Sequence, residues 1–158
     1  MVVLSDEAIL SAIDIGELNI EPFNVNNLTP NGYDLTIDEV EIPNETKISK
    51  GSLVIPAGKR FAVSTKERIE CGANVCAQLW LRTSWARKGI MCSFGKIDSG
   101  FKGTLTLLGF NSGSEDVELK MGETFAQMVF EMMSGPAASL YSERSGNYQN
   151  QKGITWSK

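Results

Sequence analysis

The chain has 158 residues, enough for one domain with a hydrophobic core, and its 42% hydrophobic and 22% charged content is that of a globular protein. Its 15 Lys and Arg against 19 Asp and Glu give a net charge of −4, which argues against a nucleic-acid-binding protein with a broad basic face. It contains no histidine, which excludes Ser-His-Asp and Cys-His catalysis and His-liganded metals. Acid–base chemistry would therefore fall to carboxylates, Lys, Tyr or metal-bound water.

The first expected element is a short helix that begins after Ser5. Ser5 is a suitable N-cap, Asp6 and Glu7 would lie in the first turn, and Gly16 would end the helix. The opening segment meets charged residues too early for a signal peptide, and no apolar run approaches the roughly 18 residues of a membrane span. These features predict a cytoplasmic protein that has no membrane partner.

Beyond this helix the hydrophobic pattern shifts to a period of two. Apolar and polar residues alternate over 33–37 and 75–81, as in half-buried strands. Further strands are expected near 52–55, 60–65, 104–111, 116–120 and 124–133, with turn signals at 30–32, 56–58 and 111–113. Many short strands with one helix predict a mainly β fold, either a sandwich, a jelly roll or a barrel.

Three cysteines lie in the middle of the chain, at Cys71, Cys76 and Cys92. Their number is odd, they form no CxxC pair, and the signature of zinc deaminases is missing. We therefore expect buried thiols in a reducing compartment.

The positive charge is concentrated between Arg82 and Lys102. This window holds five basic residues and one acid, Asp98, so its net charge is +4 and the rest of the chain carries −8. Such a window suggests a small anionic ligand, and the alternative is a solvated basic loop. Within it, the arginines and hydroxyls of 82–87 resemble a phosphate-binding cluster at the start of a short helix, or an ordinary surface turn.

Asp98 lies among lysines in a segment, 95–103, that contains three glycines. It is either a turn-forming Asp, whose side chain bonds nearby amides, or a carboxylate base beside an anionic ligand that the glycines allow to approach closely.

The last residues, 142–158, differ in composition from the body of the chain, 1–141. They are rich in Ser, Gly, Asn and Gln, with isolated large side chains at Tyr148, Ile154 and Trp156. This C-terminal tail is either a frayed terminus or a mobile segment that closes over a bound ligand.

Several motifs together resemble the superfamily of dUTPases and dCTP deaminases. They occur in the family's order along nearly the whole chain: NGYDL at 31–35, RTSWARKG at 82–89, IDSGFKG at 97–103, the segment from Gly122 through Gln127 to Phe130, and YQNQKG at 148–153. The tail and the opening residues resemble the deaminase branch. The resemblance implies a distorted β jelly roll, or β-clip, that forms homotrimers with active sites between subunits.

The same resemblance implies roles for individual residues, with a deoxyuridine or deoxycytidine triphosphate and Mg²⁺ as ligands. Phosphates would be held by Arg82, Thr83, Ser84 and Arg87. The deoxyribose would lie against Phe101, and the strand around Thr106, Leu107 and Leu108 would read the pyrimidine edge. Tyr141, Tyr148 and Gln151 match further ligand-contacting positions. Gln127 fits the dUTPase form of its motif, or is an ordinary outward-facing strand residue. Asp34 would support the metal through water, or would be an ordinary strand-end residue.

One position favours hydrolysis over deamination. Deaminases of this family have a catalytic Glu ten residues after the motif Asp, whereas the tenth residue after Asp98 is Leu108, which cannot transfer a proton. Asp98 can still activate water for attack on the α-phosphorus of a nucleotide. We therefore expect a dUTP diphosphatase, with a dCTP deaminase and a catalytically silent nucleotide-binding regulator as the alternatives.

Overall fold

The computed structural model of the chain describes residues 2–157. Its N-terminal helix, α1 (Asp6–Asp14), begins where expected, because the Ser5 side chain accepts a hydrogen bond from the Ala8 amide at 3.3 Å. Ile9 and Ala12 are the buried residues of this helix. Strand β1 (Val2–Val3) precedes α1 and pairs with the end of β15 (Thr124–Met132).

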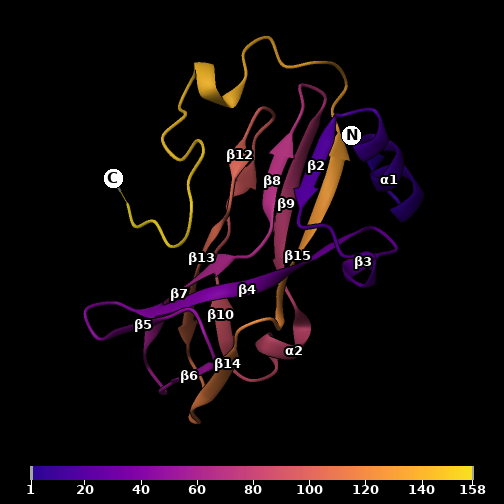
Figure 1. Ribbon diagram of the computed structural model, residues 1–158. Helices are drawn as coiled ribbons and strands as arrows, with labels where there is room; N and C mark the ends of the chain where they lie inside the picture. The colour runs from indigo at the N-terminus through magenta and orange to yellow at the C-terminus, as the bar shows by residue number, and fades with distance from the viewer. Residues whose placement is uncertain (1, 158) are drawn as a thin grey trace.

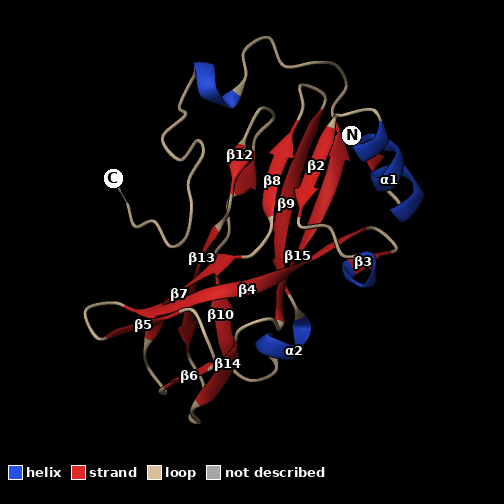
Figure 2. Ribbon diagram, viewed as in Figure 1, coloured by secondary structure: helices blue, strands red, loops and turns tan. Residues whose placement is uncertain are grey.

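The body of the fold is a curled antiparallel sheet (Figures 1 and 2). Its strand order is β10 (Ile90–Cys92), β13 (Thr106–Asn111), β7 (Arg60–Thr65), β4 (Gly32–Ile42), β15, β9 (Val75–Leu81) and β11 (Lys96–Ile97). The short strands β3 (Leu28–Thr29) and β5 (Thr46–Ile48) pair with β4 outside this order. The expected strands near 52–55, 60–65, 104–111, 116–120 and 124–133 are all present.

Strand β4 joins the two halves of this sheet. Its first half, Tyr33–Thr36, pairs with β15, and its second half, Ile37–Glu41, pairs with β7. The register of both pairings shifts near this crossing, and such bulges increase the local twist of a sheet. One long strand therefore serves both halves, which produces the jelly-roll-like curl.

Two smaller sheets complete the fold. One is β12 (Lys102–Gly103), β8 (Arg68–Cys71) and β2 (Leu18–Glu21), and the other is β14 (Val117–Lys120) with β6 (Ser52–Ile55). A helix of four residues, α2 (Thr83–Ala86), follows β9, and 3-10 turns cover Val25–Asn27 and Tyr141–Glu143.

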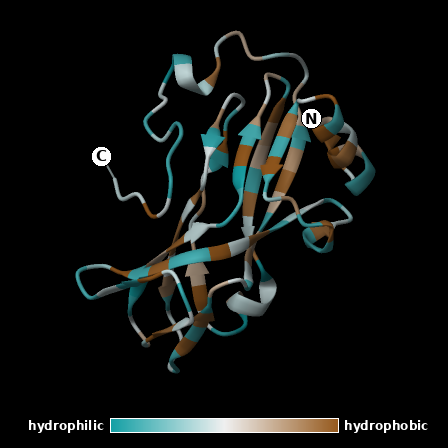
Figure 3. Cartoon of the chain, viewed as in Figure 1, coloured by the Kyte–Doolittle hydropathy of each residue, from teal (hydrophilic) through white to brown (hydrophobic). Residues whose placement is uncertain are grey.

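The core lies inside the curl, where the strands bring their hydrophobic residues together (Figure 3). Its largest fully buried side chains include Tyr33, Phe61, Phe125 and Phe130. The rings of Phe61 and Phe125 meet edge to face with centroids 6.1 Å apart, a favourable aromatic geometry. Among the described residues, none of the helices is long and apolar enough to cross a membrane.

Candidate active site

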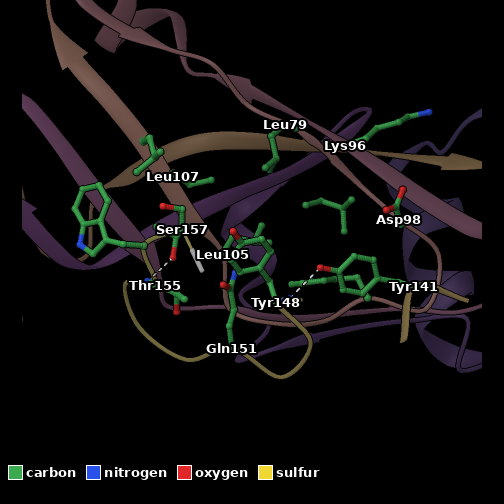
Figure 4. Close-up of a pocket in the computed structure, with 16 residues that line it drawn as sticks. Leu79, Lys96, Asp98, Leu105, Leu107, Tyr141, Tyr148, Gln151, Thr155 and Ser157 are labelled. Carbon is green, nitrogen blue, oxygen red and sulfur yellow. Dashed lines mark hydrogen bonds between the residues drawn. The ribbon is translucent and has the colours of Figure 1, made fainter. Parts of the chain in front are cut away.

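A pocket of about 390 Å³ lies between the C-terminal tail and the sheet (Figure 4). Most of its lining comes from the loop before β12, strand β13 and the tail, and the rest includes residues of β9 and β11. The described lining residues are Leu79, Gly95, Lys96, Ile97, Asp98, Phe101, Leu105, Thr106, Leu107, Leu108, Tyr141, Tyr148, Gln151, Thr155, Trp156 and Ser157. The structure therefore brings together eight of the sequence-predicted site residues.

Asp98 lies at one end of this pocket, beside Tyr141 (Figure 4). Its carbonyl oxygen accepts a hydrogen bond from the Phe101 amide at 3.1 Å, which closes a tight turn. At Gly100 within this turn φ is +82°, and a Cβ would lie 2.6 Å from the Cβ of Leu140. Position 100 therefore needs glycine for two reasons: its backbone is left-handed, and the chain at Leu140 approaches it closely. The Asp98 side chain itself is exposed and free to face a ligand.

An aromatic wall stands next to Asp98. Phe101 is buried and packs edge to face against Tyr141, with ring centroids 5.7 Å apart. The Tyr141 hydroxyl in turn accepts a hydrogen bond from the Tyr148 amide at 3.1 Å. The wall thus ties the loop before β12 to the tail.

Strand β13 forms the side of the pocket. Leu107 is buried beneath it, whereas Leu108 points outward with 48% of its surface exposed. Asp98 is the one carboxylate among the described residues that line the pocket.

Gln151 occupies the tail side of the pocket. Its side-chain amide donates to the Thr104 carbonyl at 2.7 Å, and its own carbonyl accepts from the Thr104 amide at 3.1 Å. Its Oε1 atom is buried and has no hydrogen-bond partner among residues 2–157. A buried acceptor of this kind costs free energy until a donor reaches it.

The other predicted residues lie around α2. Arg82 is the N-cap residue of this helix and forms an ion pair with Asp34 on β4. Its guanidinium also donates to the Thr124 hydroxyl. Thr83, Ser84 and Arg87 lie at the surface of this end of the sheet. Gln127 on β15 donates to the Thr29 hydroxyl at 2.7 Å.

Asp34 is buried beside Arg82. Burial raises the pKa of Asp34 above its ordinary value, and the Arg82 guanidinium offsets part of this shift. Within this chain, the Asp34 carboxylate therefore acts as the ion-pair partner of the Arg82 guanidinium. No group of three or more Asp, Glu, Cys or His residues that could hold a metal occurs in the described part of the chain.

One chain does not bring the Arg82 group and Asp98 together. Ile97 pairs with Ala77, so Asp98 lies opposite Cys76, six residues before Arg82 along the same stretch of chain. Six extended residues span about 20 Å. The positive window predicted from the sequence is accordingly no single patch: Arg82 pairs with Asp34, while Lys96 and Lys102 pair with Glu131 and Glu70 at 3.4 and 3.3 Å.

The prediction of buried thiols is confirmed for two of the three cysteines. Cys71 and Cys76 are buried, Cys92 is half-buried, and all three are free. Burial raises the pKa of Cys71 and of Cys92 to about 12, so both thiols stay protonated and unreactive at neutral pH.

Several lining residues were not predicted from the sequence. Trp156, Thr155 and Ser157 come from the tail, and Lys96 comes from β11. Trp156 carried a signal as a large aromatic side chain in a polar segment, and Lys96 carried one as a member of the positive window.

Residues 37–133 match a family model described as dCTP deaminase-like. A curated relative, the dCTP deaminase of Thermococcus kodakarensis, is 40% identical over 145 residues, which cover 90% of this chain and 92% of that protein. Another, named probable deoxyuridine 5'-triphosphate nucleotidohydrolase, comes from Sulfolobus islandicus rod-shaped virus 1. It is 32% identical, and the alignment covers 99% of this chain and 98% of that protein.

Solved structures share the fold. The 2'-deoxycytidine 5'-triphosphate deaminase of Agrobacterium tumefaciens superposes with a TM-score of 0.68 at 18% identity, over 82% of this chain and 48%, about half, of that chain. The dUTPase of Staphylococcus aureus phage phi11, in which a structural Mg(II) ion is described, superposes with a TM-score of 0.55 at 15% identity, over 77% of this chain and 94% of that chain. At this level of identity the likeness establishes the dUTPase-like fold.

Proposed function

The chain belongs to the dCTP deaminase-like family, and on that premise we propose that it hydrolyses dUTP to dUMP and pyrophosphate. Relatives within the family carry the names of both a deaminase and a dUTP hydrolase. The choice between these reactions rests on the side chains of the pocket.

The observation that carries the proposal is that the pocket contains Asp98 but has a leucine, Leu108, at the position of the deaminase Glu. Deamination at pyrimidine C4 requires a group that carries protons between water and the amino group. Leu108 occupies the position where the resemblance expects the catalytic Glu, and it lines the pocket with no ionisable atom. The nearby carboxylates of Glu39 and Glu41 bond the tail at the Ile154 amide and the Trp156 indole. Hydrolysis needs only one carboxylate, and Asp98 supplies it.

Asp98 would orient a water molecule and accept its proton as the oxygen attacks the α-phosphorus. The α–β phosphoanhydride bond then breaks and pyrophosphate leaves. Charge developing on the phosphate oxygens would be stabilised by Arg82 and Arg87, with the hydroxyls of Thr83 and Ser84 as further donors. Positioning and electrostatics supply most of the catalysis in such a reaction, so a protein without histidine can carry it out.

The donor set of the chain fits Mg²⁺ that is held mainly by phosphates. This ion retains several waters and commonly uses one or two carboxylates together with substrate oxygens, so a dedicated protein cage is unnecessary. When bound, it would neutralise charge on the triphosphate. Asp34 would act on it only through water, because its carboxylate pairs with Arg82.

A second copy of the chain would complete the site. Asp98 and Arg82 are about 20 Å apart along β9 within one chain, too far to act on the same phosphates. We infer a homotrimer in which Arg82, Thr83, Ser84 and Arg87 of one subunit face the Asp98 pocket of another.

The second candidate function is dCTP deamination, which the names of relatives with up to 40% identity favour. Because position 108 is a leucine, a carboxylate from another position would then have to transfer the proton.

One experiment distinguishes these functions. Purified protein is incubated with Mg²⁺ and dUTP, dCTP, dTTP or UTP, and both pyrophosphate and ammonia are measured. We expect pyrophosphate from dUTP and no ammonia from dCTP. Ammonia from dCTP would establish the deaminase instead, and tight nucleotide binding without either product would indicate a regulatory protein.

A further inference from the structure

We propose that Trp156 is a positioning residue that holds the C-terminal tail across the pocket through Glu41 and Arg60. We call Trp156, Glu41 and Arg60 the Trp156 latch. Its effect on nucleotide binding rests on the proposed function, but its effect on the tail does not.

The middle of the tail is held beside β12. The Asn150 amide donates to the Lys102 carbonyl at 2.7 Å, and Gln151 pairs with Gly103 as an isolated bridge. These contacts involve mainly backbone atoms around the IDSGFKG motif at 97–103, where Gly103, at φ +151°, leaves room for Gln151. Asn150 and Gln151 belong to the YQNQKG motif at 148–153.

The last residues of the tail are held by side chains of β4 and β7. The Ile154 amide donates to Glu39 at 3.1 Å, and the Trp156 indole N–H donates to Glu41 at 2.9 Å. The Arg60 guanidinium lies over the Trp156 ring, 5.8 Å from its centroid. An indole is suited to this place because its face attracts a cation and its edge carries a single N–H donor.

The register of the sheet explains why the indole fits here. Leu108 of β13, Ala62 of β7 and Glu41 of β4 are cross-strand neighbours and form one row on the same face. Trp156 lines the pocket with Leu108 and bonds to Glu41, so it spans this row. Ala62, the small residue in the middle, is fully buried.

The tail forms one wall of the pocket. Five of the sixteen described lining residues belong to it: Tyr148, Gln151, Thr155, Trp156 and Ser157. The Thr155 amide donates to the Thr106 hydroxyl at 2.9 Å, and this hydroxyl donates to the Gly153 carbonyl at 3.3 Å. In Figure 1 the tail runs alongside β12 and β13 toward the C-terminus. Loss of the latch would leave residues 153–157 held only by the bonds to Glu39 and Thr106, so this end of the wall would open more often.

The first test measures the tail directly, without nucleotide. Lys152 and Arg144 are exposed tail residues at which trypsin cleaves. In Trp156→Ala we expect cleavage after Lys152 to accelerate about tenfold, because a hydrogen bond to a charged group and a cation–π contact together change an opening equilibrium by roughly one decade. Cleavage after Lys50 and Lys120, far from the tail, should keep its rate.

Conservative variants separate the two contacts of the latch. Trp156→Phe keeps a ring over Arg60 but loses the N–H bond to Glu41, so its cleavage rate should fall between those of the unmodified protein and Trp156→Ala. Glu41→Gln should behave like Trp156→Phe or more mildly, since its amide oxygen still accepts. Glu45→Gln, at an exposed glutamate that pairs with Lys59, is the matched control and should leave the tail unchanged.

The second test measures nucleotide turnover. We expect Trp156→Ala to raise KM for dUTP about tenfold and to leave kcat within a factor of about two, because the latch positions the binding wall and does not touch the reacting atoms. A variant that is merely less stable would instead lose active protein, and so kcat, with KM unchanged.

These outcomes decide the proposal. Unchanged cleavage after Lys152 in Trp156→Ala would overturn it, as would an equal acceleration at Lys50 and Lys120, which indicates general destabilisation. A KM that stays constant while kcat falls would also overturn it. If the unmodified protein hydrolyses no dUTP, the proposed function fails, while the cleavage rates still decide the latch.

Discussion

Asp98 combines a fixed backbone with an exposed side chain. Its backbone is fixed by the turn that ends at Phe101, while its side chain remains exposed to the pocket. A base needs this arrangement, because its position must be constant and its oxygens must be free to contact water.

We expect Asp98→Asn to bind dUTP with about the original affinity and to lose turnover by a factor on the order of 10² to 10⁴, the usual contribution of a general base. Pyrophosphate release and equilibrium binding measure the two effects separately. Asp38→Asn, at an exposed position of β4, is the control. Full activity of Asp98→Asn would contradict the assignment of the base.

Glu67 is a buried carboxylate outside the pocket. It is 2% exposed and accepts a hydrogen bond from the Thr36 amide at 2.8 Å. Burial raises the pKa of Glu67 above its ordinary value, and the bond from Thr36 offsets part of this shift. The folded protein therefore binds a proton at the Glu67 carboxyl more tightly than the unfolded chain does.

The sign of the pH effect follows from this raised pKa. Its contribution to stability is complete below the pKa of the unfolded chain and is lost as the pH rises through the pKa of the folded state. We expect the free energy of unfolding of Glu67→Gln to increase relative to the unmodified protein between about pH 4 and pH 7, because the variant has no charge to desolvate. Urea unfolding across this range measures the difference. A difference that does not vary with pH would show that the carboxyl titrates equally in both states.

At the scale of elements, the pairing of β4 with β15 determines where the NGYDL motif at 31–35 lies. Gly32 begins β4, and a Cβ there would lie 2.5 Å from the Met128 carbonyl oxygen of β15. Because this obstacle is backbone in the middle of the sheet, it cannot move aside. The close approach holds Asp34, two residues later, next to Arg82.

We therefore expect Gly32→Ala to destabilise the protein by about 1 to 3 kcal/mol, the usual cost of overpacking. Thermal unfolding measures this loss. Gly135→Ala is the matched control, because a Cβ at Gly135 meets nothing within 4 Å. Equal melting temperatures for the two variants would show that β4 and β15 can separate here at little cost.

At the scale of the whole molecule, the proposed catalytic residues form two groups. One surrounds Asp98 and the tail, and the other surrounds α2 and Arg82, at the far end of β9. An exposed apolar set on β10 and β13, consisting of Met91, Leu108 and Phe110, adds surface that a second copy could cover.

Shared sites predict complementation between inactive variants. Asp98→Asn and Arg82→Ala should each be inactive alone, whereas their co-expressed mixture should recover a measurable fraction of the activity. In the proposed trimer, mixed assemblies would contain sites that combine the intact Asp98 of one subunit with the intact Arg82 of another. Activity assays on tagged, co-purified mixtures, with light scattering for the subunit number, test this prediction. A mixture that remains inactive while forming mixed trimers would place both residues in one subunit's site.

The sequence by itself determined the parts of this protein that depend on near neighbours. The cap at Ser5, the alternation that predicts β4 and β9, and the glycines around Asp98 act through adjacent backbone, so a linear pattern reveals them. The absence of histidine likewise restricts the chemistry, because folding cannot supply a type of side chain that the chain lacks.

Only the tertiary structure decided what depends on residues far apart in the chain. Strands as short as β11 and β12 are stabilised by partners from distant segments and have too few residues for a periodic signal. Trp156 gains its role from Glu41 and Arg60, about a hundred residues earlier in the chain. The charged window from Arg82 to Lys102, continuous in sequence, is divided by the length of a strand, because antiparallel pairing places Asp98 and Arg82 at opposite ends of β9.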